Sequence, residues 1–480
     1  MAHGRRGKTG MKARFWKVAA LLVLWGGIVA LFWTFARVGE EAAPASSVPV
    51  TPTREPVPRA TALFVPSPTP TAASQALAPE VVAALERMER EVADVRQLAI
   101  LRALPRKVYS RQAWTQQWTA GFLDAYPAEE VGREALVLTA LGWRRVGDSL
   151  WKAYYRLFDA AVARRFAVYD APAQTMALNA EVPFDGAAKG AYVRAFVHAL
   201  QAQNFAWQAF GVANVPSFSC LLKEDACRAR AALTQGDALW SAVFWAAQYA
   251  SPAEQRQMQA QTVEGMGLAG LLWFVQHQAL FPYEAGLNFV AVLYSRGGWE
   301  AVNAAYAAPP VSSEQILHPE RYPDVQPLSV TLPALAPVLG TEWEKVAQGT
   351  LGEWGVLALL AYGVEPAVRL DAGVARAAAD GWDGDAYALF RHRESGALLL
   401  VSQVVWASGA ERYEFTKAFM QYLNARTGTR AEVREGLTVW RTATAFHVLF
   451  AGPRTTVWIM APGEDLARAV LAAVRAQQEG

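Results

Sequence analysis

Residues 190–205 read GAYVRAFVHALQAQNF, a pattern typical of an amphipathic helix. Arg194 and His198 are four residues apart, and this spacing places both side chains on one face of the helix, one turn apart. Ionisable side chains that share a helix face are natural candidates for a binding or catalytic site. We therefore expect any functional site of this chain to include this helix.

Two histidines at this spacing can bind one zinc ion, and a glutamate after the first can act as general base. Here only the second histidine position is filled, by His198. Arg194 is a permanent cation that repels a divalent metal, and Ala195 cannot accept a proton. A lone histidine is more often a core residue, hydrogen-bonded to backbone or to Gln235, than a metal ligand. Arg194 either pairs with Asp237 or lies on a solvated rim.

The segments before this helix predict a hairpin preceded by helices. Residues 165–170 and 175–180 read as two short strands around a turn that contains Pro172. Globular sequence begins near Pro79, which suits a helix N-terminus. Apolar stripes predict helices over 80–104, 110–126, 128–141 and 150–163.

The segments after this helix are expected to be helical as far as residue 307. The predicted helices cover 237–249, 251–274, 283–293 and 298–307. A proline-rich loop follows over 309–330. Polar loop residues commonly line a cleft or cap a helix, and both alternatives stay open for Ser313, Glu314, Gln315 and His318.

Beyond about Gly340 the pattern becomes α+β. We expect an antiparallel sheet with helices packed on it. The predicted helices are 342–362, 411–427 and 465–477, and the predicted strands are 386–393, 397–406, 437–443, 445–450 and 455–460. The carboxylates of 381–385 alternate, but the remaining EF-hand ligands are lacking, so a turn is predicted there and not a calcium site.

Six short motifs occur in one order along the chain. They are Val168-Tyr169-Asp170, His198-Ala199-Leu200-Gln201-Ala202-Gln203, Gln235-Gly236-Asp237-Ala238, Phe281-Pro282-Tyr283, Gly297-Gly298-Trp299 and the loop 309–319, PPVSSEQILHP. In this order they resemble an uncharacterised group of zincin-like (HExxH) metallopeptidase homologues. That group has a Tyr-Asp-Pro hairpin, a helix continuing His-Ala-Leu-Gln-Asp-Gln, and a later helix that opens with Glu-Gly-Asp-Ala. The resemblance covers roughly residues 101–322 well and the C-terminal part loosely.

The resemblance implies a metal site that has lost its chemistry. Arg194 stands at the first histidine ligand, Ala195 at the general base and Gln235 at the third, glutamate ligand. His198 alone remains, and a single imidazole does not hold zinc. We therefore expect no catalytic residue, no metal and no cofactor. What remains is a vestigial cleft lined by these four residues and Asp237, in which Arg194 can bind a peptide or carboxylate.

Residues 18–36 form a stretch of 19 residues without a charge, long enough as a helix to cover roughly 28 Å. Lys17 and Arg37 bracket it. We expect a membrane anchor, with the basic leader 1–17 in the cytoplasm and the bulk of the chain outside it. A long cleavable signal peptide is the alternative. Residues 37–78 are rich in Pro, Ala, Ser and Thr, and predict a stalk or, less commonly, a proline-rich ligand.

The chain has 480 residues, 53% of them hydrophobic and 18% charged, so several domains with sizeable cores are expected. A formal net charge of +2 argues against a nucleic-acid partner. The two cysteines, Cys220 and Cys227, are too few for a zinc knuckle. Outside the cytoplasm they are expected to form a disulfide, provided that no continuous helix joins them; two free buried thiols are the alternative.

The predicted fold class is α+β. A mainly helical zincin-like domain with a small β-hairpin (79–340) is followed by a smaller C-terminal α+β domain with an antiparallel sheet (341–480). We expect a single-pass protein of the cell membrane, anchored by one N-terminal helix. Its extracytoplasmic part is expected to be catalytically inactive and to bind a peptide or protein. The alternatives are an active hydrolase with a rearranged metal site and a purely structural stalked domain.

Overall fold

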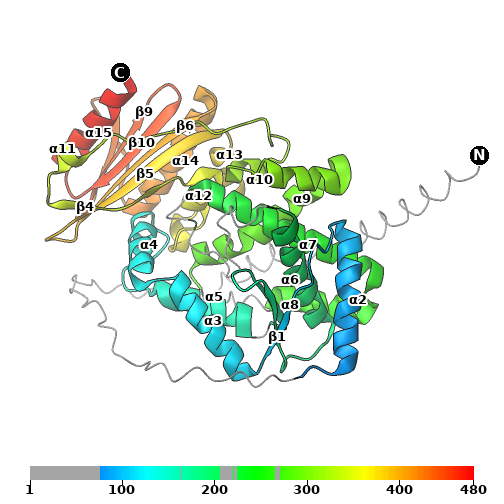
Figure 1. Cartoon of the computed structure of the whole chain (residues 1–480). Coiled ribbons are helices and arrows are strands. Elements are labelled where there is room, and N and C mark those ends of the chain that lie inside the picture. Colours follow the sequence, from blue (N-terminus) through cyan, green and yellow to red (C-terminus); the bar gives the residue numbers. More distant parts are fainter. Residues whose placement is uncertain (1–75, 164, 206–219, 221–223, 265–270, 480) are drawn as a thin grey trace, which may run out of the picture.

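The computed structural model describes residues 76–163, 165–205, 220, 224–264 and 271–479. The predicted leader, membrane anchor and most of the stalk lie outside these residues. Within the described part of the chain, no helix combines the length and apolar character needed to cross a membrane. Figure 1 shows a helical region formed by the first two thirds of the described chain and a large sheet formed by the last third.

The helical region contains nine helices of varied length within the described residues. They are α2 (Pro79–Arg96), α3 (Arg111–Ala125), α4 (Ala128–Ala140), α5 (Leu150–Ala163), α6 (Gly186–Asn204), α7 (Asp225–Tyr249), α8 (Pro252–Glu264), α9 (Trp273–Ala307) and α10 (Ser313–Leu317). The predicted start of α7 at residue 237 was wrong, because this helix begins twelve residues earlier, at Asp225. The helix therefore carries Gln235 and Asp237 in its middle.

A small sheet lies beside α6. Its strands are β1 (Arg106–Tyr109), β2 (Ala167–Asp170) and β3 (Thr175–Asn179), in the order β1-β3-β2. The predicted hairpin is present, with β2 antiparallel to β3. The parallel partner β1 was not predicted, because four residues reading RKVY carry almost no strand signal by themselves.

Helix α6 is central because nearly every one of its faces is covered. Ala188 donates its backbone N–H to the Asp185 carboxylate at 3.0 Å, which caps the first turn. Twelve of its 19 residues are buried, so the helix has no broad solvated face. A side chain at Gly190 would begin 3.0 Å from the Met258 methyl group, so glycine permits the close approach of α8.

Helices α7 and α9 also approach closely. A Cβ atom at Gly236 would lie 2.1 Å from the backbone oxygen of Gly286, a separation that no side chain tolerates. Helix α9 is interrupted near its end at Gly297 and Gly298, and Gly298 has a φ of 64°. Glycine adopts this left-handed conformation without steric cost, so the chain can change direction there.

The C-terminal region holds the large sheet. Its seven strands are antiparallel and run in the order β4-β5-β6-β10-β9-β8-β7. They are β4 (Trp343–Gly349), β5 (Trp382–His392), β6 (Leu398–Trp406), β7 (Glu432–Arg434), β8 (Leu437–Arg441), β9 (Phe446–Ala451) and β10 (Thr455–Ala461). The helical elements here are α11 (Ala336–Leu339), α12 (Gly352–Ala361), a 3₁₀ turn (Pro366–Val368), α13 (Ala372–Ala379), α14 (Gly409–Thr427) and α15 (Glu464–Glu479).

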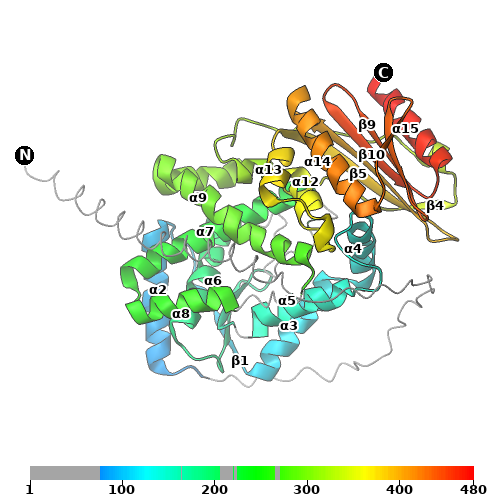
Figure 2. The same ribbon diagram turned by 180° about the vertical axis from the view of Figure 1, so that it is seen from behind.

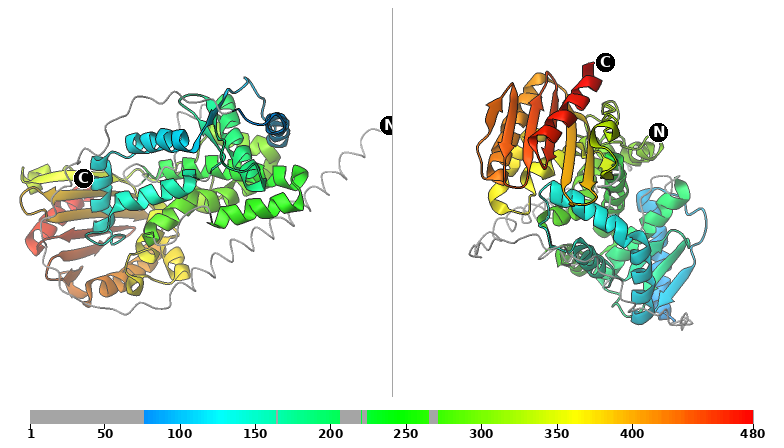
Figure 3. Two further views of the ribbon diagram at one scale, coloured as in Figure 1. Left: turned by 90° about the horizontal axis from the view of Figure 1, so that it is seen from below. Right: turned by 90° about the vertical axis from the view of Figure 1, so that its left-hand side faces the viewer.

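Both faces of this sheet are covered. Successive side chains of a strand point to opposite faces, so Val457 and Ile459 pack with α15 while Trp458 packs on the other side with Phe419 of α14. Figure 2 shows α12, α13 and α14 between the sheet and the helical region. In Figure 3 the sheet occupies one end of the molecule.

One hydrophobic core runs from the helical region into the C-terminal region. Trp143 stacks on Phe274 with 4.0 Å between ring centroids and donates its indole N–H to the backbone oxygen of Ala358 at 3.0 Å. Phe274 in turn contacts Trp354 of α12, with ring centroids 5.6 Å apart. Helix α12 therefore joins the two regions by burial of aromatic surface.

Two predictions for the C-terminal region were wrong. Residues 342–362 do not form one helix: β4 pairs with β5, and α12 starts only at Gly352, whose φ is 71°. Residues 381–385 were predicted as a turn, but β5 begins at Trp382, with a bulge between Trp382 and Gly384. In both places pairing between strands overrides the local pattern. The α+β class and the antiparallel C-terminal sheet are as predicted.

Candidate functional site

Helix α6 carries Arg194, Ala195 and His198 as predicted. Arg194 and His198 are half-buried and lie one turn apart, while Ala195 is buried. The Nδ1 atom of His198 is 2.9 Å from Oε1 of Gln201. Burial lowers the pKa of His198, and hydrogen bonds with Gln201 and with Gln235 of α7 oppose that effect. The imidazole is therefore neutral at pH 7, and it contacts Gln235 as expected.

Arg194 differs from its neighbours because it has no hydrogen bond or ion pair with any residue that the structure describes. Burial lowers the pKa of Arg194 to about 10, and the nearby charge of Arg165 acts in the same direction. The guanidinium remains charged at neutral pH. The half-buried cation is thus available to an acceptor from outside the described chain.

Of the two alternatives for Arg194, the pair with Asp237 is not formed. Asp237 is fully buried and binds Arg96 instead, with Nε and Nη2 donating at 2.6 and 3.0 Å. Tyr306 donates its hydroxyl to the same carboxylate at 2.7 Å, and Gln201 donates its amide at 3.0 Å. These bonds connect α2, α6, α7 and α9, so Asp237 is a structural junction. Nothing in the local sequence of Arg96 distinguishes it from an ordinary basic residue at a helix C-terminus.

The side chains at the three implied ligand positions do not fit zinc. They are one neutral imidazole, one amide and one guanidinium, from His198, Gln235 and Arg194. Structural and catalytic zinc sites use at least three imidazole, thiolate or carboxylate ligands. These three side chains therefore cannot support a reaction step on a zinc ion.

The loop that starts at α10 is held mainly by bonds to backbone groups. Ser313 donates its backbone N–H to Asp225 and accepts from the backbone of Trp354 at 3.0 Å. The Gln315 amide bonds to the backbone of Val311 and of Val325, at 2.8 and 2.7 Å. Ser313 therefore braces the loop against α7 and α12, whereas Gln315 holds two parts of the loop together.

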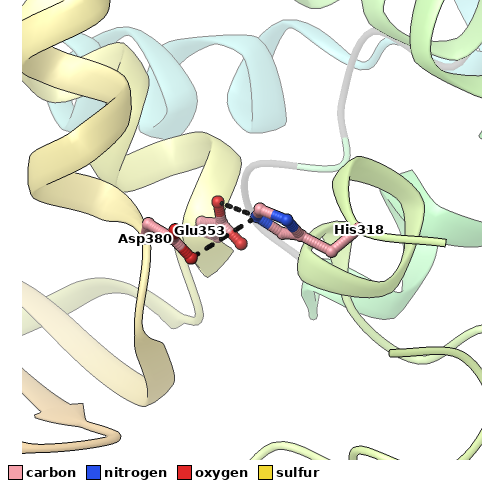
Figure 4. A group of neighbouring side chains, drawn as sticks. All are labelled: His318, Glu353 and Asp380. Carbon is pink, nitrogen blue, oxygen red and sulfur yellow. Dashed lines mark hydrogen bonds and ion pairs between the residues drawn. The ribbon is translucent and has the colours of Figure 1, made fainter. Parts of the chain in front are cut away.

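His318 and Glu314 belong to a second ionisable group. His318 Nε2 is 2.8 Å from Glu353 Oε1 and 3.7 Å from Asp380 Oδ1, and Figure 4 shows both carboxylates facing the imidazole. Arg321 connects Glu314 with Asp380, with N–O distances of 3.0 and 2.7 Å. The sequence singled out Glu314 and His318 but gave no indication of Glu353 or Asp380.

The electrostatics of this second group follow from burial. Burial raises the pKa of Glu353, and it raises the pKa of Glu314 to about 7, with the Glu353 charge contributing. The hydrogen bond that the Glu353 carboxylate accepts from the imidazole raises the pKa of His318. Burial alone would raise the pKa of Asp380, but the hydrogen bond and charge of Arg321 hold it below its usual value. Glu314 therefore exchanges its proton near neutral pH.

Cys220 and Cys227 form a disulfide, with their Cα atoms 5.6 Å apart. Helix α7 begins at Asp225, so Cys220 lies outside the helix and Cys227 in its first turn. This arrangement meets the condition that no continuous helix joins the two residues.

One family model matches the chain. Residues 339–471 match a domain of unknown function, DUF8575. The match begins close to the predicted domain boundary at residue 341. It includes Glu353 and Asp380, whereas His318 lies before the first matched residue. Searches of curated proteins and of solved structures found no match.

Proposed function

We propose that this chain is a membrane-anchored, extracytoplasmic protein with a zincin-like helical domain that no longer catalyses peptide hydrolysis. In this proposal the former cleft binds a peptide or protein carboxylate through Arg194. The observation that carries the proposal is the half-buried guanidinium of Arg194, which has no acceptor among the described residues.

A carboxylate is the ligand that best suits this guanidinium. Arginine presents parallel N–H donors that match the two oxygens of a carboxylate, and such charge-assisted bonds are strong. Burial makes an uncompensated charge costly, as the lowered pKa of Arg194 reflects. Arg165 adds positive potential at the same place. An incoming anion would relieve both effects.

The arrangement of His198 and Gln235 supports a zincin-like origin for the cleft. The resemblance implies that the second histidine position and the third ligand position face each other from two helices. His198 on α6 and Gln235 on α7 are hydrogen-bonded in this way. Their neighbours explain the loss of activity: Arg194 repels a metal, and Ala195 offers no general base.

The extracytoplasmic location is proposed from two observations. Residues 18–36 are uncharged and long enough to span a bilayer, with basic residues before them. Cys220 and Cys227 form a disulfide, which is the usual state of neighbouring cysteines outside the cytoplasm. Fractionation of cells and protease protection of the intact chain test this part of the proposal.

Binding is tested with the full chain in detergent. The probes are fluorescent random-sequence peptides with a free C-terminal carboxylate, and the same peptides amidated at the C-terminus. We expect the free carboxylate to bind about 10- to 100-fold more tightly, since a hydrogen bond to a charged group contributes roughly 1.5–3 kcal/mol. Arg194→Ala should remove this difference, and Arg194→Lys should keep part of it.

Arg256→Ala is the matched control, because Arg256 is an exposed arginine on the neighbouring helix α8. Equal affinity of the wild type and Arg194→Ala for both probes would contradict the proposal. Mass spectrometry of the peptides after incubation distinguishes the alternative: cleavage that disappears in His198→Ala would identify an active hydrolase with a rearranged site.

A further inference from the structure

Three potential metal ligands from separate segments meet at one point. His318 follows α10, Glu353 lies in the first turn of α12, and Asp380 directly follows α13. One donor atom from each lies within 4.8 Å of the other two. Figure 4 shows the imidazole on one side and the two carboxylates on the other.

The donor separations are close to those around a small metal ion. Zinc–nitrogen and zinc–oxygen bonds of about 2.0–2.2 Å at tetrahedral angles put neighbouring donors roughly 3.3 Å apart. The distances from His318 Nε2 to Glu353 Oε1 and to Asp380 Oδ1 are 2.8 and 3.7 Å, one on each side of that value. The third separation, between the Glu353 and Asp380 donor atoms, is at most 4.8 Å.

Two buried carboxylates here lack part of their expected hydrogen bonding. Glu353 is 1% exposed and Glu314 is 4% exposed. The Oε2 atom of each has no hydrogen-bond partner among the residues that the structure describes. Buried polar atoms are nearly always paired, and an unpaired carboxylate oxygen is costly to bury. A cation bound at Glu353 would compensate for this cost.

The surrounding charges favour a cation as well. Glu314, Glu353 and Asp380 contribute three carboxyl groups, and among the described residues Arg321 forms ion pairs with two of them, Glu314 and Asp380. Arg321 and the backbone N–H of Gly381 both bind Asp380 Oδ1, at 2.7 and 2.9 Å. Metal-ligating carboxylates are commonly oriented by such outer hydrogen bonds.

We propose that His318, Glu353 and Asp380 bind one divalent transition-metal ion of the zinc type. An imidazole together with two carboxylates suits zinc or manganese, whereas calcium and magnesium prefer oxygen ligands only. Water completes the coordination. The ion joins the loop after α10 to α12 and α13, and so connects the helical region with the region that matches DUF8575. This proposal is independent of ligand binding at Arg194.

The test uses the full chain in detergent, free of histidine tags, stripped with a chelator and titrated calorimetrically with zinc chloride. We expect about one zinc ion per chain. Asp380→Asn should weaken zinc binding at least about tenfold, because losing a ligand costs no less than losing an outer-shell partner. Glu353→Gln and His318→Gln should do the same. Asp380 is half-exposed, so Asp380→Asn is the variant expected to preserve the fold.

His392→Gln is the matched control. His392 also lies beside a glutamate, Glu342, at 3.3 Å, but this glutamate is exposed and no group of three potential metal ligands among the described residues includes His392. Unchanged zinc affinity in Asp380→Asn would overturn the proposal, as would equal loss in His392→Gln. Equal affinity for calcium and zinc would overturn the assigned metal class. If His198→Gln lost zinc binding while Asp380→Asn kept it, the ion would be bound in the α6–α7 cleft. This result would contradict both the site proposed here and the loss of the metal site in the cleft.

Discussion

The Nε2 atom of His318 lies 2.8 Å from Oε1 of Glu353, across the junction between the loop after α10 and the first turn of α12. Glu353 is almost completely buried, so this contact joins two regions of the chain at a place where water screens the Glu353 charge only weakly. The same contact brings Glu314 and Asp380 into one electrostatic group. The protonation of this group should therefore affect the stability of the whole fold.

Glu314 should make the protein less stable as pH rises towards neutrality. Burial raises the pKa of Glu314 from 4.5 to about 7. A carboxyl group with a raised folded-state pKa contributes stability that is complete below its unfolded pKa and is lost as pH rises through the folded value. Between about pH 4.5 and 7 the wild type should lose on the order of 2 kcal/mol relative to Glu314→Gln, at about 1.4 kcal/mol per pKa unit.

Urea unfolding of both proteins across this pH range measures the difference. Glu320→Gln is the control, because Glu320 is an exposed carboxylate near His318. A stability difference between wild type and Glu314→Gln that does not change with pH would contradict the raised pKa.

The pair between Arg96 and Asp237 should be essential for stability. Both side chains are 0% exposed, and Arg96 also lies 4.3 Å from the ring centroid of Trp299. Removing one member of a buried pair leaves an uncompensated charge, so Arg96→Leu or Asp237→Asn should cost about 3–5 kcal/mol in chemical denaturation. Arg145→Ala breaks the exposed pair with Glu365 and should cost less than about 1 kcal/mol. A similar loss of unfolding free energy for the buried pair and the exposed pair would refute the structural role of Asp237.

Gly236 should be irreplaceable because α7 and α9 touch there. A Cβ atom at this position would lie 2.1 Å from the backbone oxygen of Gly286, so Gly236→Ala should destabilise the fold by roughly 1–3 kcal/mol. A Cβ atom placed at Gly132 of α4 would have no neighbouring atom within 4 Å among the described residues. Gly132→Ala should therefore stabilise the protein by about 0.5–1 kcal/mol, because alanine favours helix. Thermal unfolding of both variants would show opposite shifts; a shift of the same sign would contradict the close approach.

The disulfide between Cys220 and Cys227 should contribute about 2 kcal/mol, since it closes a short loop. Under non-reducing conditions neither cysteine should react with an alkylating agent, and intact mass spectrometry detects this. The double variant Cys220→Ser/Cys227→Ser should unfold at lower urea concentration and lose its response to reductant. Full alkylation of the untreated protein would show that the bond does not form in solution.

Local sequence patterns predicted the helices and hairpins whose signals lie within one segment. The β2–β3 hairpin and helices α3 to α5 follow from apolar periodicity and turn residues. Strand β4 was missed because only its pairing with β5 makes residues 343–349 extended. Local propensity cannot contain that information, since β4 and β5 are separated by α12 and α13.

The candidate site shows the same division. The sequence placed His198 and Gln235 near each other through a resemblance, and they do contact. It suggested Arg194 as a partner for Asp237, whereas the carboxylate selects Arg96, 141 residues away. Glu353 and Asp380 are isolated acidic residues in the sequence, and only the docking of α12 and α13 on the loop after α10 brings them to His318. Long-range packing therefore determines which charged groups meet.

We propose that α6 and α7 carry the remains of a zinc site. The most direct test of this proposal restores the implied residues with Arg194→His, Ala195→Glu and Gln235→Glu in the Asp380→Asn background, and then measures zinc content after chelator stripping and reloading. Circular dichroism and thermal unfolding establish that the variant is folded. We predict about one zinc ion more than in Asp380→Asn alone, lost again when His198→Gln is added. A folded variant that binds no additional zinc would contradict the claim.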